Sequence, residues 1–588
     1  MNCVRLFSCS LPFALLASAP AQDLAKFLPK HAQIVAVSDG PKRLAERFEG
    51  TNIARMLSSP EAQPIRAIPT VVVDFVAGLA EQNGSKFDLH GLLDTLAGYG
   101  GRVGIGVEFD LAASRASGSI EFLLSVVAEP DGSTDLGALG EKIADEADRG
   151  GATLSEIDAG PGFRALIHPA DVDVTLPRLV DGHLVMFVGS RLDDSLPRGF
   201  GADATLGAKL PETAAEAAML LHVDGGIVEL LTLAIEIGNR NAPRGRYGSS
   251  SSRPSQMDES VSRLVRSLTE RLSFEDIEVS LSRSGQYLRT VGEIHGDASR
   301  EGLIDLFQPK AKSTPIGRLV PAGNQDWQYL RFDIAAVAKL LITALEAEQP
   351  GVGGLIGSAL EAEEVDLDRD ILNAFDGQLL WLSDPLLDVP MTPADEDDEE
   401  QSPGNFALAV GMRDAKATEA LVEKLLRSHG LHAARKSEDY QGATVRHLPL
   451  LGEFRWVFLP DALVIGFGAE GKKMLQGIID RSVASARGEP APEWSEQAKA
   501  RRDALTNGWR DLGMTDASGS IGTVRSYLNL AFDQIQAEHE SEPGMDTLVP
   551  ALREGLDCWM RIAGQFDVLT TVSAMSVTPG HLRSESIQ

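Results

Sequence analysis

The sequence has 588 residues, with 85 Asp and Glu against 54 Lys and Arg and a formal net charge of −31. A chain of this length is longer than a single hydrophobic core usually supports, so we expect at least two cores. The hydrophobic fraction of 43% is typical of a globular protein. The acidic excess disfavours nucleic-acid binding, which needs a basic face, and the sequence reveals no local basic patch.

Residues 1–21 have the pattern of a secretory signal peptide. Arg5 supplies the positive charge, residues 6–16 are mainly apolar, and an Ala-Pro-Ala sequence at 19–21 is a cleavage site. The apolar stretch is too short to span a bilayer. We therefore expect a periplasmic or extracellular protein with no membrane span after cleavage. The mature chain would keep only Cys558, which we interpret as a buried, inert thiol.

Short motifs recur in the same order in the two halves of the chain. Examples are Leu28-Pro29 with Val320-Pro321, Asp88-Leu89 with Asp366-Leu367, and Leu184-Val185-Met186 with Leu463-Val464-Ile465. The repetition predicts two related modules behind the signal peptide, at 22–312 and 313–588.

Within each module, predicted strands often follow one another directly. Trp456-Val457-Phe458 and Leu463-Val464-Ile465 are apolar runs separated by the turn-forming pair Pro460-Asp461. This order predicts an α+β fold of mainly antiparallel sheet with helices packed on one face. A Ser-rich segment at 239–255 and an acidic segment at 385–403 are predicted to be exposed loops.

A glycine-rich segment, Gly466-Phe467-Gly468-Ala469-Glu470-Gly471-Lys472-Lys473, follows a predicted strand. Its residues Gly466, Gly468, Gly471 and Lys472 match parts of the dinucleotide and phosphate-loop patterns. However, Lys473 stands where a phosphate loop needs a hydroxyl for magnesium, and no second parallel strand ending in an acid follows. We interpret the segment as a turn between a strand and a helix, and expect no cofactor.

The nearest approach to a metal site is a run of six acids at 395–400, represented by Asp395, Asp397, Asp398 and Glu399. Such a run is more typical of a solvated loop than of fixed coordination geometry. Three aspartates from Asp366 alternate like a calcium loop, but Ile371 replaces the required glycine. Asp366 is instead predicted to cap a helix, as is Asp88 in the first module.

The eleven histidines are scattered and form no zinc-binding HExxH motif. His168 and His447 fall at similar positions near strand ends in the two modules, which is a weak indication of a site. Gly430 beside His429 indicates a helix end. We assign no catalytic residue from the sequence.

Four segments carry a resemblance to a known family: "LPKHAQIVAVSDGPKRL", "DLHGLLDTLAG", "VDGHLVMFVGS" and "LPDALVIGFGAEGKKML". Together with the signal peptide they resemble a family of exported bacterial proteins known only as a domain of unknown function. The resemblance implies an envelope location and a modular α+β fold, and supplies no activity or site residue.

The sequence thus favours an exported, non-enzymatic binding or scaffolding protein of the cell envelope, whose partner is an envelope protein or polymer. One alternative is a secreted or periplasmic hydrolase with a dispersed catalytic site. Another is a cation-binding surface protein that uses the acids at 395–400.

Overall fold

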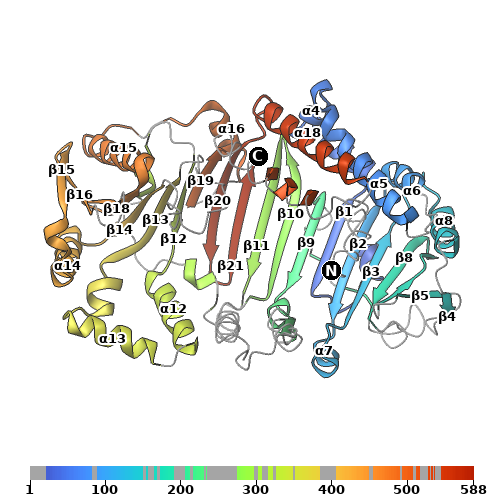
Figure 1. Cartoon of the computed structure of the whole chain (residues 1–588), viewed down its shortest axis with the longest axis horizontal. Coiled ribbons are helices and arrows are strands. Elements are labelled where there is room, and N and C mark those ends of the chain that lie inside the picture. Colours follow the sequence, from blue (N-terminus) through green and yellow to red (C-terminus); the bar gives the residue numbers. More distant parts are fainter. Residues whose placement is uncertain are drawn as a thin grey trace. The chain divides into compact units, whose positions relative to one another are not determined.

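The computed structural model groups the chain into two compact units (Figure 1). It describes residues 22–82, 89–149, 154–156, 164–168, 172–190, 206–208, 210–211, 216–230, 274–296, 304–307, 316–321, 326–348, 351–383, 406–448, 454–490, 493–506, 511–516 and 544–588, with isolated residues between them. Unit 1 draws on the chain up to 262, on 275–294 and on 534–562, and unit 2 on 263–274, 295–533 and 563–588.

The strands of unit 1 form an antiparallel sheet. In chain order they are β1 (Ile34–Asp39), β2 (Arg102–Phe109), β3 (Phe122–Ala128), β4 (Leu154–Glu156), β5 (Arg164–His168), β6 (Val172–Thr175), β7 (Arg178–Val180), β8 (His183–Gly189), β9 (Met219–Asp224), β10 (Asp276–Ser284) and β11 (Tyr287–His295). Across the sheet the pairing order is β4, β5, β6, β8, β3, β2, β1, β9 and β10. β7 also pairs with β8.

Helices of unit 1 connect and cover these strands. They are α2 (Gln22–Ala25), α3 (Pro41–Phe48), α4 (Asn52–Ser58), α5 (Gln63–Gln82), α6 (Leu89–Ala97), α7 (Leu111–Ser117), α8 (Leu136–Arg149) and most of α18 (Met545–Ala563), with the 3-10 turn η2 (Pro60–Ala62).

Two hydrophobic clusters place the core of unit 1 on both faces of its sheet. On one face, Leu96 of α6 and Leu139 of α8 pack against Val126 of β3. On the other face, Leu28, which follows α2, packs with Val127 of β3, the next residue along the strand after Val126. Successive residues of a strand point to opposite faces, so an apolar strand such as β3 serves both clusters. The α2 segment thus covers a second face, in addition to the predicted single helical layer.

Unit 2 contains a second antiparallel sheet. Its strands are β12 (Trp327–Arg331), β13 (Phe375–Ser383), β14 (Phe406–Met412), β15 (Lys436–Tyr440), β16 (Ala443–His447), β17 (Arg455–Phe458), β18 (Ala462–Phe467), β19 (Asp511–Asp516), β20 (Thr570–Thr578) and β21 (His581–Ile587). They pair in the order β15, β16, β17, β18, β14, β13, β12, β19, β20 and β21.

The helices of unit 2 are α12 (Ile334–Glu348), α13 (Val352–Ala362), η6 (Leu367–Leu372), α14 (Ala415–Ser428), α15 (Gly468–Ala486) and α16 (Glu496–Ala504), with the short turns η4 (Ile304–Phe307), η5 (Ile316–Leu319) and η7 (Leu431–Ala434). α15 packs against β14 and β18. Leu475 and Ile479 of α15 and Val464 of β18 are fully buried, so this contact forms the core of the unit.

The two sheets repeat one strand order. β9 pairs with β1 beside β2, and β19 pairs with β12 beside β13. The compact units nevertheless differ from the predicted division at 312/313, because residues 534–562 belong to unit 1. There the Sγ atom of Cys558 on α18 donates a hydrogen bond to the carbonyl of Glu61, at 2.8 Å. A helix from the end of the chain therefore packs on the unit formed by its beginning.

The fold is a mixed α+β fold built on antiparallel sheet, as the strand order predicts. In the described part of the chain, no helix combines the length and the apolar character needed to cross a membrane. The predicted signal peptide at 1–21 and the predicted loops at 239–255 and 385–403 lie outside the described residues.

Candidate functional site

The glycine-rich segment forms the junction between β18 and α15, as expected for a strand-to-helix turn. A Cβ atom at Gly466 would lie 2.6 Å from the carbonyl oxygen of Gly471, and one at Gly471 would lie 2.5 Å from the carbonyl oxygen of Phe406. Gly468 has a φ of 77°, which other residues rarely adopt. Close backbone packing and one left-handed turn therefore explain all three glycines without a bound phosphate.

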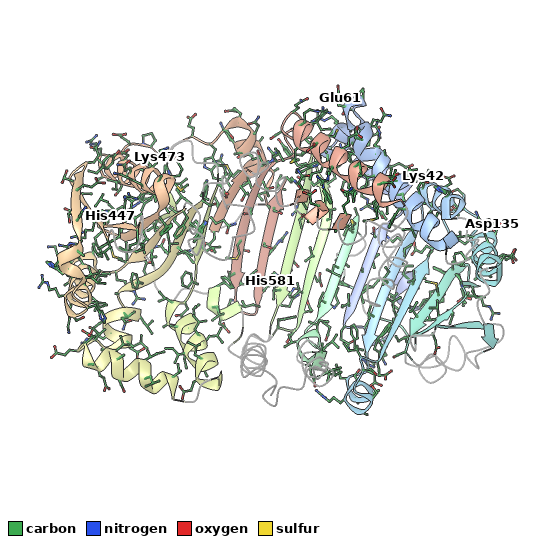
Figure 2. The ribbon with its side chains drawn as sticks, viewed as in Figure 1. Lys42, Glu61, Asp135, His447, Lys473 and His581 are labelled. Atoms are coloured by element: carbon green, nitrogen blue, oxygen red, sulfur yellow. The ribbon has the colours of Figure 1, made fainter. Side chains whose placement is uncertain are left out.

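The lysines of this segment are engaged in ion pairs. Nζ of Lys472 lies 3.1 Å from a carboxylate oxygen of Glu438. Lys473, which is labelled in Figure 2, pairs with Glu470 one turn earlier on α15. Both lysines therefore neutralise neighbouring acids of unit 2. This arrangement fits the interpretation of the segment as a structural turn.

The structure describes some of the other residues that the sequence singled out. Asp366 caps η6 by accepting a hydrogen bond from the Arg369 amide at 2.7 Å. The candidate metal ligands Asp395, Asp397, Asp398 and Glu399, like Asp88, lie outside the described residues. His168 ends β5 in unit 1, and His447 ends β16 in unit 2 (Figure 2).

A charged groove lies along α14 in unit 2. Asp414 starts the helix, because its carboxylate accepts hydrogen bonds from the amides of Lys416 and Ala417, each at 3.0 Å. From there Lys416, Glu419, Ala420, Glu423, Lys424 and Arg427 follow at helical spacing and line one side of the groove. This one stripe supplies three of the cationic side chains.

The remaining groove residues come from beyond the helix. His432 lies in η7, Arg435 follows η7, and Arg446 lies on β16. The nine residues line an open groove of about 650 Å³, a volume within the range of ligand sites in proteins. We call this feature the α14 groove.

Ion pairs hold the inner part of the α14 groove in place. Glu423 pairs with Arg435, and its Oε1 lies 3.4 Å from Nε of Arg446. Arg446 also pairs with Glu419, and only 12% of its side chain is exposed. The two glutamates thus anchor the two arginines, which restricts the arginine side chains to fixed positions.

The outer cations of the α14 groove face solvent. Lys416 and Arg427 are exposed and stand eleven residues apart on the same side of α14. Lys424 donates a hydrogen bond to the carbonyl of Glu364 at 3.0 Å, and its Nζ lies 3.6 Å from the carboxylate of the same residue. The groove has five Lys or Arg residues and one histidine against two glutamates, and this local excess of basic residues was not singled out from the sequence. The helical spacing of the basic residues in 416–427 was the signal available in the sequence.

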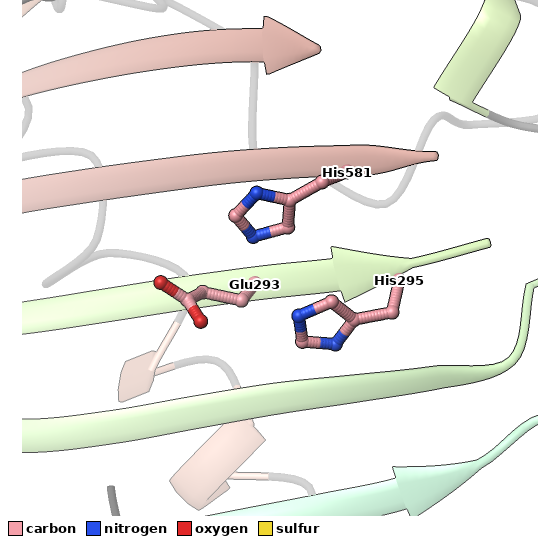
Figure 3. Close-up of side chains that lie close together, drawn as sticks. All are labelled: Glu293, His295 and His581. Carbon is pink, nitrogen blue, oxygen red and sulfur yellow. The ribbon is translucent and has the colours of Figure 1, made fainter. Parts of the chain in front are cut away.

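A different cluster contains two histidines. His295 and His581 of unit 2 stack with their ring centroids 4.9 Å apart and their planes 3° from parallel. Figure 3 shows the two imidazole rings close together. The lone pairs of an imidazole lie in the plane of its ring, so parallel stacked rings do not aim their nitrogens at one point. This geometry is a ring contact rather than a coordination site.

Comparisons with known proteins give no family. No family model and no curated protein matches the chain. Among solved structures, crystal form III of TP0453 has a TM-score of 0.23 and 11% identity, covering 51% of this chain and 83% of that chain. Crystal form I of TP0453 has a TM-score of 0.22 and 14% identity, covering 52% of this chain and 84% of that chain.

Proposed function

We propose that this chain is an exported, non-enzymatic binding protein of the cell envelope, and that its α14 groove binds an anionic envelope polymer. The observation that carries the proposal is the concentration of cations in this groove on a chain whose net charge is −31. Such a local excess of one sign attracts ligands of the opposite sign and raises their rate of association.

The arrangement of the groove favours binding over chemistry. Its two glutamates are occupied by Arg435 and Arg446, so they serve to position the arginines. The exposed Lys416 and Arg427 then offer two positive charges along α14, separated by about three helical turns or roughly 16 Å. Two separated charges suit a polymer with repeated anionic groups better than a single small anion.

The binding test uses the full chain and dextran sulfate as a polymer of defined charge, with neutral dextran for comparison. We expect binding to dextran sulfate alone, weakening as salt is raised because the contacts are electrostatic. The double charge reversal Lys416→Glu with Arg427→Glu should weaken binding about tenfold or more, equivalent to about 1.4 kcal/mol.

A matched control separates the groove from overall charge. Lys499→Glu with Arg502→Glu makes the same change in net charge on α16 of the same unit, outside the α14 groove. This control should bind dextran sulfate as the unaltered chain does. Equal weakening by both double variants, or no binding by the unaltered chain, would contradict the proposal.

The export part of the proposal has its own test. Deletion of residues 2–21 should leave the protein in the cytoplasmic fraction of a bacterial host, while the full chain is processed and found outside the cytoplasm. The size of the exported form, measured by mass spectrometry, should correspond to cleavage after Ala21. Equal distribution of both forms would count against export.

A further inference from the structure

A histidine and two carboxylates meet on the sheet of unit 1, away from the α14 groove. β9 and β10 are antiparallel, and their register places His222 directly opposite Glu278. Asp276 precedes Glu278 by two residues on β10, so both carboxylates lie on the same face of the sheet as the imidazole.

This face of β9 is the one that turns toward the core. Leu220, two residues before His222, belongs to the cluster that includes Leu28 after α2. On the opposite face of the strand, Leu221 is 40% exposed. At the edge of β9 away from β10, His222 is paired with Val35 of β1, and Val35 is almost fully buried. The histidine is therefore fixed between two strands on a largely covered surface.

The three side chains converge closely. Nδ1 of His222 lies 3.9 Å from Oε1 of Glu278, and these side chains are 16% and 14% exposed. One ligand atom from each of His222, Asp276 and Glu278 lies within 4.8 Å of the other two. Nδ1 of His222 is buried and has no hydrogen-bond partner among the residues that the structure describes. A separation of 3.9 Å is too long for a direct hydrogen bond.

The separation is slightly wider than that of two ligand atoms on one metal ion. Zinc binds imidazole nitrogen and carboxylate oxygen at about 2.0–2.2 Å, so neighbouring ligands in its tetrahedral shell stand about 3.5 Å apart, and a side-chain shift of about half an ångström would close the difference. We propose that His222, Asp276 and Glu278 form a binding site for a divalent transition metal, with Zn²⁺ the expected ion. This inference is independent of the α14 groove.

The donor set decides the class of metal. One nitrogen and two carboxylate oxygens suit zinc or manganese, whereas calcium requires six to eight oxygen ligands. Among divalent ions of the first transition series, zinc binds nitrogen and oxygen sites more tightly than manganese does. We therefore expect the order of affinity Zn²⁺, then Mn²⁺, then Ca²⁺.

The test is a titration of the EDTA-treated full chain with Zn²⁺ in competition with a chromogenic chelator. The unaltered chain should bind Zn²⁺ and show a higher melting temperature with Zn²⁺ than with EDTA, because an ion that binds only the folded state stabilises it. His222→Ala and Glu278→Gln should each weaken Zn²⁺ binding at least tenfold and remove the Zn²⁺-dependent rise in melting temperature.

Two further histidine variants serve as controls. His447→Ala removes a histidine at the end of β16, and His581→Ala removes one of the stacked pair. Both should keep the affinity of the unaltered chain. Loss of Zn²⁺ binding in His581→Ala with retention in His222→Ala would overturn the assignment, as would a failure of the unaltered chain to bind Zn²⁺.

The assignment of the Zn²⁺ ligands can be tested even if one variant fails to fold. The melting temperature of each variant in EDTA reports its fold without metal. If His222→Ala unfolds in EDTA, the near-isosteric variants Glu278→Gln and Asp276→Asn carry the test, because they remove a charge while keeping the shape. Unchanged Zn²⁺ affinity in both would overturn the proposal.

Discussion

A carboxylate oxygen of Asp39 lies 2.7 Å from Nε of Arg47, at the end of the first strand of unit 1. The second oxygen lies 3.8 Å from Nε of Arg102, and Asp39 and Arg102 are almost completely buried. Burial disfavours the charged carboxylate and raises the pKa of Asp39 to about 6, although Arg47 and Arg102 act in the opposite direction.

This raised pKa predicts a loss of stability as the pH rises. Between the unfolded pKa of about 3.9 and the folded pKa of about 6, the folded state binds more protons at Asp39 than the unfolded state does. The stabilisation is complete below the lower value and disappears above the upper one. The side chain of the Asp39→Asn variant cannot titrate. The free energy of unfolding of this variant should therefore lack the pH-dependent contribution of Asp39, which is at most about 3 kcal/mol.

The measurement is denaturant unfolding of both proteins across this pH range. The unaltered chain should lose stability relative to Asp39→Asn as the pH rises, on top of any constant difference caused by the lost charge. A difference between the two proteins that stays constant, or that grows in favour of the unaltered chain, would refute the prediction.

Asp131, before α8, should show the opposite pH dependence. Its carboxylate accepts hydrogen bonds from the amides of Gly100 at 2.8 Å, Ser133 at 2.8 Å and Thr134 at 2.6 Å. Partial burial opposes ionisation, but these amides hold the pKa of Asp131 well below its usual range. The folded state therefore releases this proton more readily than the unfolded state, and stability from Asp131 is lost as the pH falls below about 4.

We expect Asp131→Asn to lower the free energy of unfolding by about 1–3 kcal/mol at neutral pH, with a smaller effect in acid. Asp135→Asn is the matched control, because Asp135 accepts one amide hydrogen bond, from Ala138 at 3.0 Å. The control should lower the free energy of unfolding by less than Asp131→Asn does. Equal losses in both variants, or an Asp131→Asn effect that grows in acid, would refute this explanation.

The sequence predicts the local features of the fold because nearby residues determine them. The turn at Pro460-Asp461 joins β17 to β18, and Asp366 caps η6, as their residue types indicate. The alternating burial along β18 follows from strand geometry, because successive side chains point to opposite faces of the sheet. Each of these depends on contacts within a few residues.

Long-range contacts account for what the sequence did not predict. His222 and Glu278 meet because β9 pairs with β10 across 56 positions, and no local pattern fixes that register. Similarly, α18 is an ordinary amphipathic helix by sequence, and its apolar side does not specify that it packs near Glu61. The metal site and the division into units were therefore out of reach of local patterns, whereas the stripe of basic residues on α14 was not.

Gly466 at the end of β18 and Gly471 in the first turns of α15 should each contribute to stability. Gly466→Ala and Gly471→Ala each place a methyl group within 2.6 Å of a backbone oxygen, so each should lower the free energy of unfolding by about 1–3 kcal/mol. Gly357→Ala on α13 meets no atom within 4 Å and should instead raise stability by up to about 1 kcal/mol. Denaturant unfolding distinguishes them, and the prediction fails if the three variants are equally stable.

Cys558 should be chemically inert while the chain is folded. It is 2% exposed on α18, and its Sγ donates a hydrogen bond to the Glu61 carbonyl at 2.8 Å. Because alkylation needs an accessible thiolate, iodoacetamide should label Cys558 at least about a hundredfold more slowly in the native protein than in denaturant. Peptide mass spectrometry measures this rate at Cys558 alone, separately from Cys3 and Cys9. Labelling of the native protein at the denatured rate would show instead that α18 detaches readily from the rest of unit 1.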